Sequence, residues 1–149
     1  MNYPNTIHPA QPLPNGRYPH FIEHDAKIWT KFLTDNPLEN ATVAYDVHIG
    51  TPAPIPPGLP PNYARMINTL SRKRIDVLIL FPNETAVVEV KPYAGPSAIG
   101  QTISYTHLVK RELPTLPNPF PCIITDTAQP DMHQICANLQ VLLIETEQE

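Results

Sequence analysis

The stretch RIDVLILFPNETAVVEVK, residues 74–91, holds two apolar runs on either side of a turn-forming cluster, PNET. Short apolar runs bounded by turn residues are typical of buried strands, so we expect IDVLILF and AVVEVK to form an antiparallel hairpin. Asp76 interrupts the first run, and Glu89 and Lys91 interrupt the second. Charged side chains in a buried hairpin cost free energy unless they neutralise one another or bind a ligand.

The register of this hairpin decides where the charges lie. A turn centred between residues 83 and 84 places Asp76 opposite Lys91 and Leu78 opposite Glu89. Because side chains alternate between faces, the three charged groups then share one face. The Cβ atoms of Asp76 and Glu89 would lie roughly 7 Å apart, which lets one divalent cation bridge both carboxylates. The alternative that this geometry leaves open is a structural ion pair between Asp76 and Lys91, with Glu89 facing water.

Two elements are expected before the hairpin. Apolar residues recur at spacings of three and four over residues 19–33, which predicts a helix that ends before Pro37. Residues 41–49 alternate between apolar and polar, which predicts a half-buried strand. Its apolar face would consist of Val43, Tyr45, Val47 and Ile49.

Four further elements are expected after the hairpin. Residues 95–112 predict a helix, 120–126 a short buried strand, 130–139 another helix and 141–145 a last strand. The order is therefore α, β, β, β, α, β, α, β. A meander followed by helical crossovers implies a mixed central sheet flanked by helices, hence an α/β (or α+β) fold class.

The length and the prolines bear on domain organisation. The 149 residues fit one domain, which we place at residues 19–149 after a proline-rich arm at residues 1–18. The 20 prolines cluster in this arm, in a loop at 51–61 and at 113–121. We interpret these segments as stiff connectors, with recruitment of a protein partner as the alternative.

Charge and hydropathy limit the partners. No apolar run approaches the length of a membrane helix and no signal peptide is recognisable, so we expect no membrane partner and a cytoplasmic location. The net charge of −4 argues against a general nucleic-acid coat, so any contact with nucleic acid would be local. Cys122 and Cys136 lack disulfide-framework or metal-site spacing, and we predict that both are reduced core thiols.

The spacing of the charged residues matches a known family. Asp76 is followed, after twelve residues, by Glu89-Val90-Lys91, behind a helix and a strand and ahead of a helix. In this the chain resembles the PD-(D/E)XK nuclease superfamily, which has a restriction-endonuclease-like core. The resemblance covers about residues 20–145, with Ile75 standing where the family name implies proline.

The second helix adds to the resemblance. Gln101 and Tyr105 match the Q-x-x-x-Y pattern of the RecB-like and phage exonuclease branch and lie on one helical face. The resemblance implies that they support the catalytic face or contact the substrate backbone. The alternative is a polar helix flank with Tyr105 packed on the sheet.

The resemblance also implies the roles of the charged residues. Asp76 and Glu89 would bind Mg²⁺ or Mn²⁺, with the Val90 carbonyl as a further ligand. Lys91 would orient the attacking water or help to deprotonate it. These roles agree with the preference of magnesium for oxygen ligands and with the need to neutralise charge on the phosphate.

An acid on the first helix belongs to the same pattern. We assign it to Glu23 rather than to Asp25, since Asp25 and the neighbouring His20 and His24 fit the position less well. The alternative for Glu23 is a solvated helix face.

A basic run enters the Asp76 strand and is the best local patch for a phosphate backbone: Arg72, Lys73 and Arg74. Further candidate backbone contacts lie at the end of the second helix: His107, Lys110 and Arg111. We assign no chemistry to Asp46 and His48, which we expect to face solvent.

The sequence therefore predicts a Mg²⁺- or Mn²⁺-dependent deoxyribonuclease acting in the cytoplasm, or in the host cytoplasm or virion if it is phage-encoded. The alternative is a nuclease-fold interaction or assembly module, such as a phage virion component or a subunit of a DNA-processing complex. An RNA substrate stays open, because nothing in the sequence reads the 2′-hydroxyl.

Overall fold

The computed structural model describes residues 3–4 and 7–146. These residues form a five-stranded sheet with the strand order β1-β2-β3-β4-β5. The first three strands form an antiparallel meander, and β4 and β5 continue the sheet in parallel to β3. The mixed central sheet is thus confirmed. The strands are β1 (Thr42–Ile49), β2 (Lys73–Leu80), β3 (Thr85–Ala94), β4 (Pro119–Ala128) and β5 (Leu142–Glu145).

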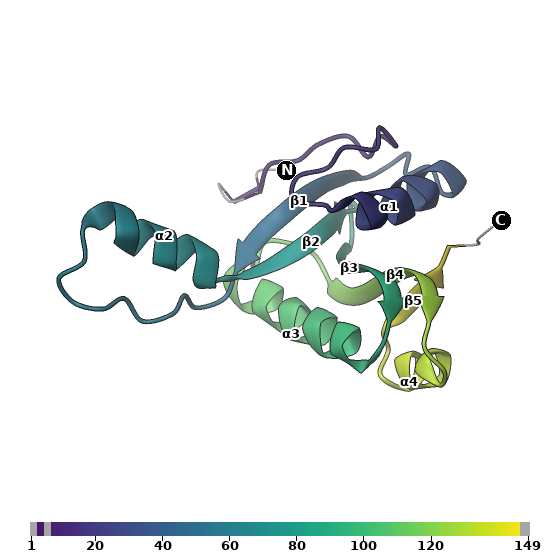
Figure 1. The fold of residues 1–149 in the computed structure, drawn as a ribbon. Helices are drawn as coiled ribbons and strands as arrows, with labels where there is room; N and C mark the ends of the chain where they lie inside the picture. The colour runs from purple at the N-terminus through teal and green to yellow at the C-terminus, as the bar shows by residue number, and fades with distance from the viewer. Residues whose placement is uncertain (1–2, 5–6, 147–149) are drawn as a thin grey trace.

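Helices lie on both faces of the sheet (Figure 1). On one face α1 (Glu23–Asp35) packs against β3 and β4, and on the other face α3 (Pro96–Glu112) packs against the same strands. The short α4 (Met132–Asn138) contacts β5. Helix α1 begins later than expected, at Glu23, and ends before Pro37 as predicted.

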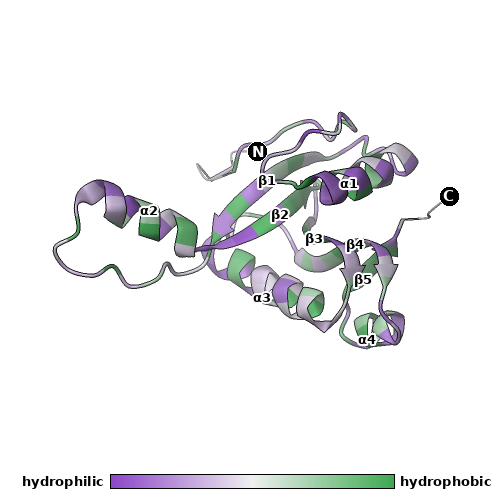
Figure 2. Ribbon diagram, in the orientation of Figure 1, coloured by the Kyte–Doolittle hydropathy of each residue, from purple (hydrophilic) through white to green (hydrophobic). Residues whose placement is uncertain are grey.

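The sheet buries an apolar layer against each set of helices. Trp29 and Phe32 of α1 pack over Val88 of β3, whereas Val109 of α3 packs over Val87 on the opposite face. In Figure 2 the meander strands accordingly carry green segments, the colour of hydrophobic residues, between purple ones. Burial on both faces explains why these strands have nearly continuous apolar runs.

The N-terminal arm lies along β1 (Figure 1). Ala10 pairs with Val43 through two backbone hydrogen bonds of 2.7 and 2.9 Å. Ile7 and Tyr18 are buried in the two core layers. The arm therefore adds to the edge of the sheet.

A helix that the sequence analysis did not predict, α2 (Pro61–Ser71), lies in the connection between β1 and β2. It projects from the body of the molecule and buries no residue (Figure 1). Its first residue is proline, which suits the first position of a helix as well as a loop. The proline-rich loop thus ends at Pro60, and the order of elements is α, β, α, β, β, α, β, α, β.

The hairpin of β2 and β3 forms as predicted, but the expected register was wrong. Leu78 pairs with Val87 instead of Glu89. The turn is tighter than expected, because the Phe81 N–H donates to the Glu84 carbonyl at 3.0 Å. Moving the turn centre by one residue shifts each pair by two, so the side chains paired in the ladder from Val77 to Leu80 keep their expected faces.

The prediction of one apolar face on β1 was also wrong. Val43 and Tyr45 lie in the core beneath α1, whereas Val47 and Ile49 lie in the core beneath α3. Asp46, between them, has a left-handed backbone conformation with φ of 52°. This conformation interrupts the two-residue alternation of an extended strand.

Two further expectations concern the cysteines and the membrane. Cys122 and Cys136 are free and buried, as predicted. Within the part of the chain that the structure describes, no helix combines the length and the apolar character needed to cross a bilayer.

Candidate active site

The candidate site lies where β2 and β3 diverge. Their ladder ends at the pair of Val77 and Val88, while β3 continues beside β4 as far as Ala94. The backbone groups of β3 beyond this fork need other partners. Asp76 supplies one, because its Oδ2 atom accepts a hydrogen bond from the Val90 N–H at 2.9 Å.

Asp76, Glu89 and Lys91 come together at this fork. The Glu89 side chain is almost completely buried, and the Lys91 Nζ lies 3.9 Å from its Oε2. The carboxyl groups of Asp76 and Glu89 are close enough that the charge of Asp76 raises the pKa of Glu89, after the larger effect of burial. The convergence thus exists despite the wrong register, because the shift by two residues preserved the faces.

The pKa values show how unfavourable two charges are at this position. Burial, followed by the charge of Asp76, raises the pKa of Glu89 to about 8 against the opposing effect of Lys91. Burial also raises the pKa of Asp76, although the Val90 N–H and Lys91 act to lower it. Near neutral pH the pair therefore retains a proton unless a cation replaces it.

The acid that α1 contributes is Asp25, not the predicted Glu23. The charge of Asp25 raises the pKa of Asp76 and Glu89, and burial raises that of Asp25 itself while Lys91 lowers it. Asp25 lies on the helical face that the core residues Ile28, Trp29 and Phe32 occupy, at spacings of three, four and seven. This helical spacing to the core residues could have identified Asp25 from the sequence.

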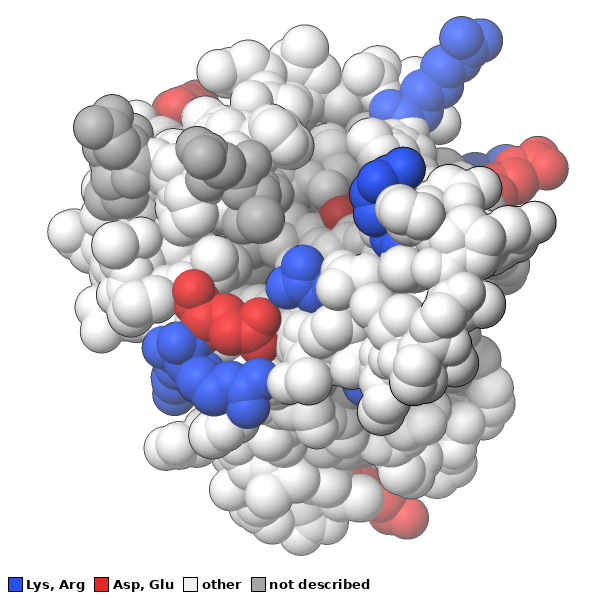
Figure 3. Space-filling model, turned by 90° about the vertical axis from the view of Figure 1, so that its left-hand side faces the viewer, with Lys and Arg blue, Asp and Glu red and all other residues white. Residues whose placement is uncertain are grey.

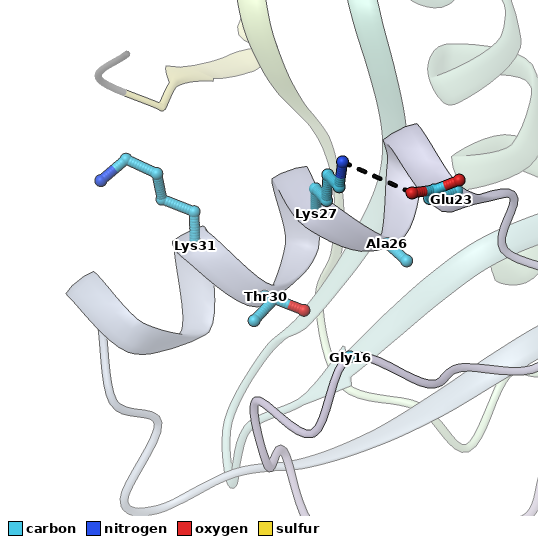
Figure 4. A pocket seen from close by; sticks show the side chains of 6 residues that line it. All are labelled: Gly16, Glu23, Ala26, Lys27, Thr30 and Lys31. Atoms are coloured by element: carbon cyan, nitrogen blue, oxygen red, sulfur yellow. Dashed lines mark ion pairs between the residues drawn. The ribbon is translucent and has the colours of Figure 1, made fainter. Parts of the chain in front are cut away.

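Glu23 lies elsewhere. Its side chain is 87% exposed and pairs with Lys27, four residues along the helix, at 3.5 Å. Figure 4 shows both on the rim of a surface hollow of about 420 Å³, which Gly16 and Thr30 also line. The structure therefore does not bring Glu23 to the other acids.

Helix α3 approaches the fork from the opposite layer. Burial and then the charges of Glu89 and Asp76 raise the pKa of Tyr105, which places its hydroxyl within the field of both acids. Gln101 precedes Tyr105 by one helical turn, and its Oε1 is buried without a hydrogen-bond partner. Both residues of the Q-x-x-x-Y pattern thus lie on the side of α3 that faces the sheet.

Unpartnered oxygens test whether these residues fit a cation. Among the described residues, five buried side-chain oxygens have no hydrogen-bond partner, and three of them belong to Asp25, Glu89 and Gln101. Buried carboxylate oxygens without partners are costly and suit a hard cation such as Mg²⁺. In the same part of the chain, no three His, Cys, Asp or Glu side chains form a ready-made metal-binding group. Two carboxylates with a backbone carbonyl still fit Mg²⁺, which keeps several water ligands.

The predicted basic patch is largely neutralised. Arg72 lies 3.4 Å from a Glu112 oxygen, and Arg74 binds Asp46 with two hydrogen bonds of 2.7 and 2.9 Å. Lys73 is exposed. Figure 3, which shows the face with α2, accordingly has blue side chains beside red ones rather than a continuous blue area. Of the other basic candidates, His107 and Lys110 line a separate hollow, and Arg111 pairs with Glu112 at 3.0 Å.

Asp46 and His48, which we expected to face solvent, do not. The Asp46 side chain is only 13% exposed and binds Arg74, and His48 lies 3.4 Å from the same carboxylate. No local sequence pattern predicts this cluster, because its members come from separate segments of the chain.

Comparisons with known proteins add little. No family model and no curated protein matches the chain. Among solved structures, the chain is similar to the crystal structure of a protein of unknown function, with a TM-score of 0.44 and 13% sequence identity. The similarity covers 80% of this chain and spans only 56% of that protein.

Proposed function

We propose that the protein is a Mg²⁺- or Mn²⁺-dependent nuclease that hydrolyses phosphodiester bonds, with DNA as its substrate and the fork as its active site. The observation that carries the proposal is the convergence of Asp76, Glu89 and Lys91, with one buried Glu89 oxygen left without a partner. The helices and meander around the fork agree with the restriction-endonuclease-like core that the resemblance implies. The cytoplasm, or a phage virion, would be the place of action.

The residues that would hold the ion are Asp76, Glu89 and the Val90 carbonyl. Asp25 takes the place that we expected for Glu23, because its unpartnered oxygen lies within the electrostatic reach of the pair. When bound, the ion lowers the pKa of a water molecule and neutralises charge on the phosphate.

The other side chains complete the chemistry. In hydrolysis a water oxygen forms a bond to phosphorus, the bond from phosphorus to the leaving oxygen breaks, and that oxygen takes up a proton. The Lys91 ammonium, beside Glu89, is placed to orient the water and to donate a hydrogen bond to the phosphate. Tyr105 brings a hydroxyl to the same acids from α3, and the unpartnered amide oxygen of Gln101 lies one helical turn before it.

Cleavage assays test this proposal directly. We expect purified protein to cut DNA with Mg²⁺ or Mn²⁺ and not with EDTA. Lys91→Ala should lower the rate by about 10²- to 10⁴-fold, the size of a lost catalytic group. Lys27→Ala, which removes a lysine from the outer face of α1, is the matched control and should keep full activity.

The form of the substrate shows the mode of cleavage. Nicked or linearised circular DNA indicates internal cleavage, whereas degradation of linear DNA alone indicates an exonuclease. Cleavage that persists in EDTA, or that Lys91→Ala leaves unchanged, would contradict the proposal.

The second candidate function is an interaction or assembly module. The observation in its favour is the projecting helix α2, on which large apolar side chains are exposed: Tyr63, Met66 and Leu70. It predicts an association that Leu70→Glu abolishes. A protein that elutes as a monomer in size-exclusion chromatography, with or without this substitution, would count against self-association through α2.

A further inference from the structure

A second, half-buried carboxylate lies on β1, beside the acid pair. Asp46 accepts hydrogen bonds from Arg74 Nε at 2.7 Å and Nη2 at 2.9 Å. The Nε2 atoms of His20 and His48 lie 2.9 and 3.4 Å from its Oδ2. One carboxylate thus holds three nitrogen-bearing side chains at one point.

The charges of this cluster leave room for an anion. Burial by itself would raise the pKa of Asp46, but the hydrogen bonds and charge of Arg74, with the charges of His20 and His48, lower it below its ordinary value. Asp46 therefore stays ionised, and Arg74 alone neutralises it. The two histidines add hydrogen-bonding nitrogens to the cluster without adding negative charge.

A cavity of about 470 Å³ lies beside this cluster, between the N-terminal arm and β1. This volume falls in the range of small-molecule sites. Besides His20 and Asp46, its wall contains His8 and Arg17. Asp46, which Arg74 already neutralises, is the only acid among the residues that line the cavity.

Two tyrosines give the cavity an aromatic wall. The rings of Tyr18 and Tyr45 lie 5.4 Å apart between their centres, and both line the cavity. Their hydroxyls are already hydrogen-bonded within the protein, to Thr30 and Trp29 respectively. Tyr18 is only 8% exposed, so the aromatic surface on which a nucleic-acid base or sugar can lie is that of the half-buried Tyr45.

The cavity is close to the acid pair. Tyr45 pairs with Val77 and Val47 pairs with Ile75, so Asp46 is level with Asp76 on the neighbouring strand. Neighbouring strands lie about 4.8 Å apart. The hydrogen bond with Asp46 raises the pKa of Arg74, and the charge of Asp76 adds to this effect.

We propose that this cavity binds one nucleotide of the substrate strand, next to the bond that the acid pair cleaves. Arg17 and His20 hold its phosphate, while its base or sugar packs against Tyr45. The inference rests on the proposed function for the identity of the strand. It explains how a chain with a net charge of −4 holds nucleic acid: the contact is a pocket, not a broad positive surface.

Binding of dTMP to the full chain in EDTA tests the pocket without any cleavage. We expect isothermal titration calorimetry to show tighter binding of dTMP than of thymidine or inorganic phosphate. Arg17→Ala and His20→Ala should each weaken dTMP binding about tenfold, as expected for a lost charged hydrogen bond. The matched control is His133→Ala, which removes a histidine of similar exposure (66% against 62%) that pairs with Glu145 at 2.8 Å, and it should change nothing.

The inference is overturned if dTMP does not bind, if inorganic phosphate binds as tightly, or if His133→Ala has the same effect as His20→Ala. Thermal melting of each variant shows whether it is folded, and both substituted side chains are exposed. Intact dTMP binding in a protein that cleaves no DNA would remove the proposed function and keep the pocket. Cleavage of DNA without dTMP binding would remove the pocket and keep the proposed function.

Discussion

Two carboxylate centres lie on the neighbouring strands β1 and β2, and their charges are compensated in opposite ways. At the fork, Asp76 and Glu89 face one another with Lys91 as the nearby cation, and a Glu89 oxygen has no partner. At the second centre, Asp46 alone faces Arg74 and two histidines. The pKa of Glu89 is consequently raised, by burial first and then by Asp76, whereas the donors around Asp46 lower its pKa despite its burial.

This difference indicates what each centre lacks. An excess of buried carboxylate favours a cation, whereas a carboxylate that an arginine already neutralises leaves the nitrogen-bearing side chains around it available to an anion. A phosphodiester nuclease needs both, because the scissile phosphate must meet a metal ion while the strand is held beside it. In the proposed nuclease, the two centres would divide these tasks between the adjacent strands β1 and β2.

Replacing the aspartate of each centre with its isosteric amide should distinguish the two centres most strongly. Asp76→Asn should lower kcat by about 10²- to 10⁴-fold, because it removes an ionised group from the reacting site. Asp46→Asn should leave kcat within a few-fold and act mainly on KM, since Arg74 and the histidines remain. Initial rates on a fluorescent oligonucleotide measure both parameters. An equal loss of kcat in the two variants would erase the distinction between the centres.

Substitutions of the two acids of α1 test which of them belongs to the fork. Asp25→Asn should raise the Mn²⁺ concentration that gives half-maximal cleavage about 10- to 100-fold, the effect of losing a group that supports a metal site. Glu23→Gln, on the outer face of the same helix, should leave the metal dependence unchanged. A larger effect for Glu23→Gln than for Asp25→Asn would restore the original assignment.

Much of the sheet could be predicted because the signals were local. The apolar runs around PNET define the hairpin, and their parity kept Asp76 and Glu89 together although the turn was placed one residue too far along. The α2 helix was missed because its first proline reads equally well as loop, and because none of its side chains is buried.

The second centre could not be predicted, because nothing local specifies it. His20 and Asp46 both adopt left-handed backbone conformations, with φ of 61° and 52°. The alternation of apolar and polar residues in a sequence does not reveal where a left-handed residue such as Asp46 interrupts a strand. Arg74 reaches Asp46 across 28 residues of sequence. Such contacts can be recognised only once the pairing of β1 with β2 is known.

The two centres should also give opposite dependences of stability on pH. Glu89 has a pKa of about 8 in the folded protein against 4.5 ordinarily. Its contribution to folding is therefore complete below pH 4.5 and is lost as the pH rises through about 8. Asp46 has a lowered pKa, so its contribution is complete above pH 3.8, its ordinary value, and is lost as the pH falls through its folded-state pKa.

Urea denaturation in EDTA at pH 5 and pH 8 measures this contrast. Glu89→Gln should gain stability relative to the natural protein as the pH rises, because the variant has no carboxyl to ionise in the buried fork. Asp46→Asn should lose about 1–3 kcal/mol at both values, since its ion pair with Arg74 is fully formed there and hydrogen bonds to charged groups contribute about this much. Mg²⁺ or Mn²⁺ should reduce the gain of Glu89→Gln at pH 8, because a bound cation stabilises the ionised pair that the variant lacks. If the gain at pH 8 is absent in EDTA, Glu89 is not held protonated by burial beside Asp76, and the contrast between the two centres fails.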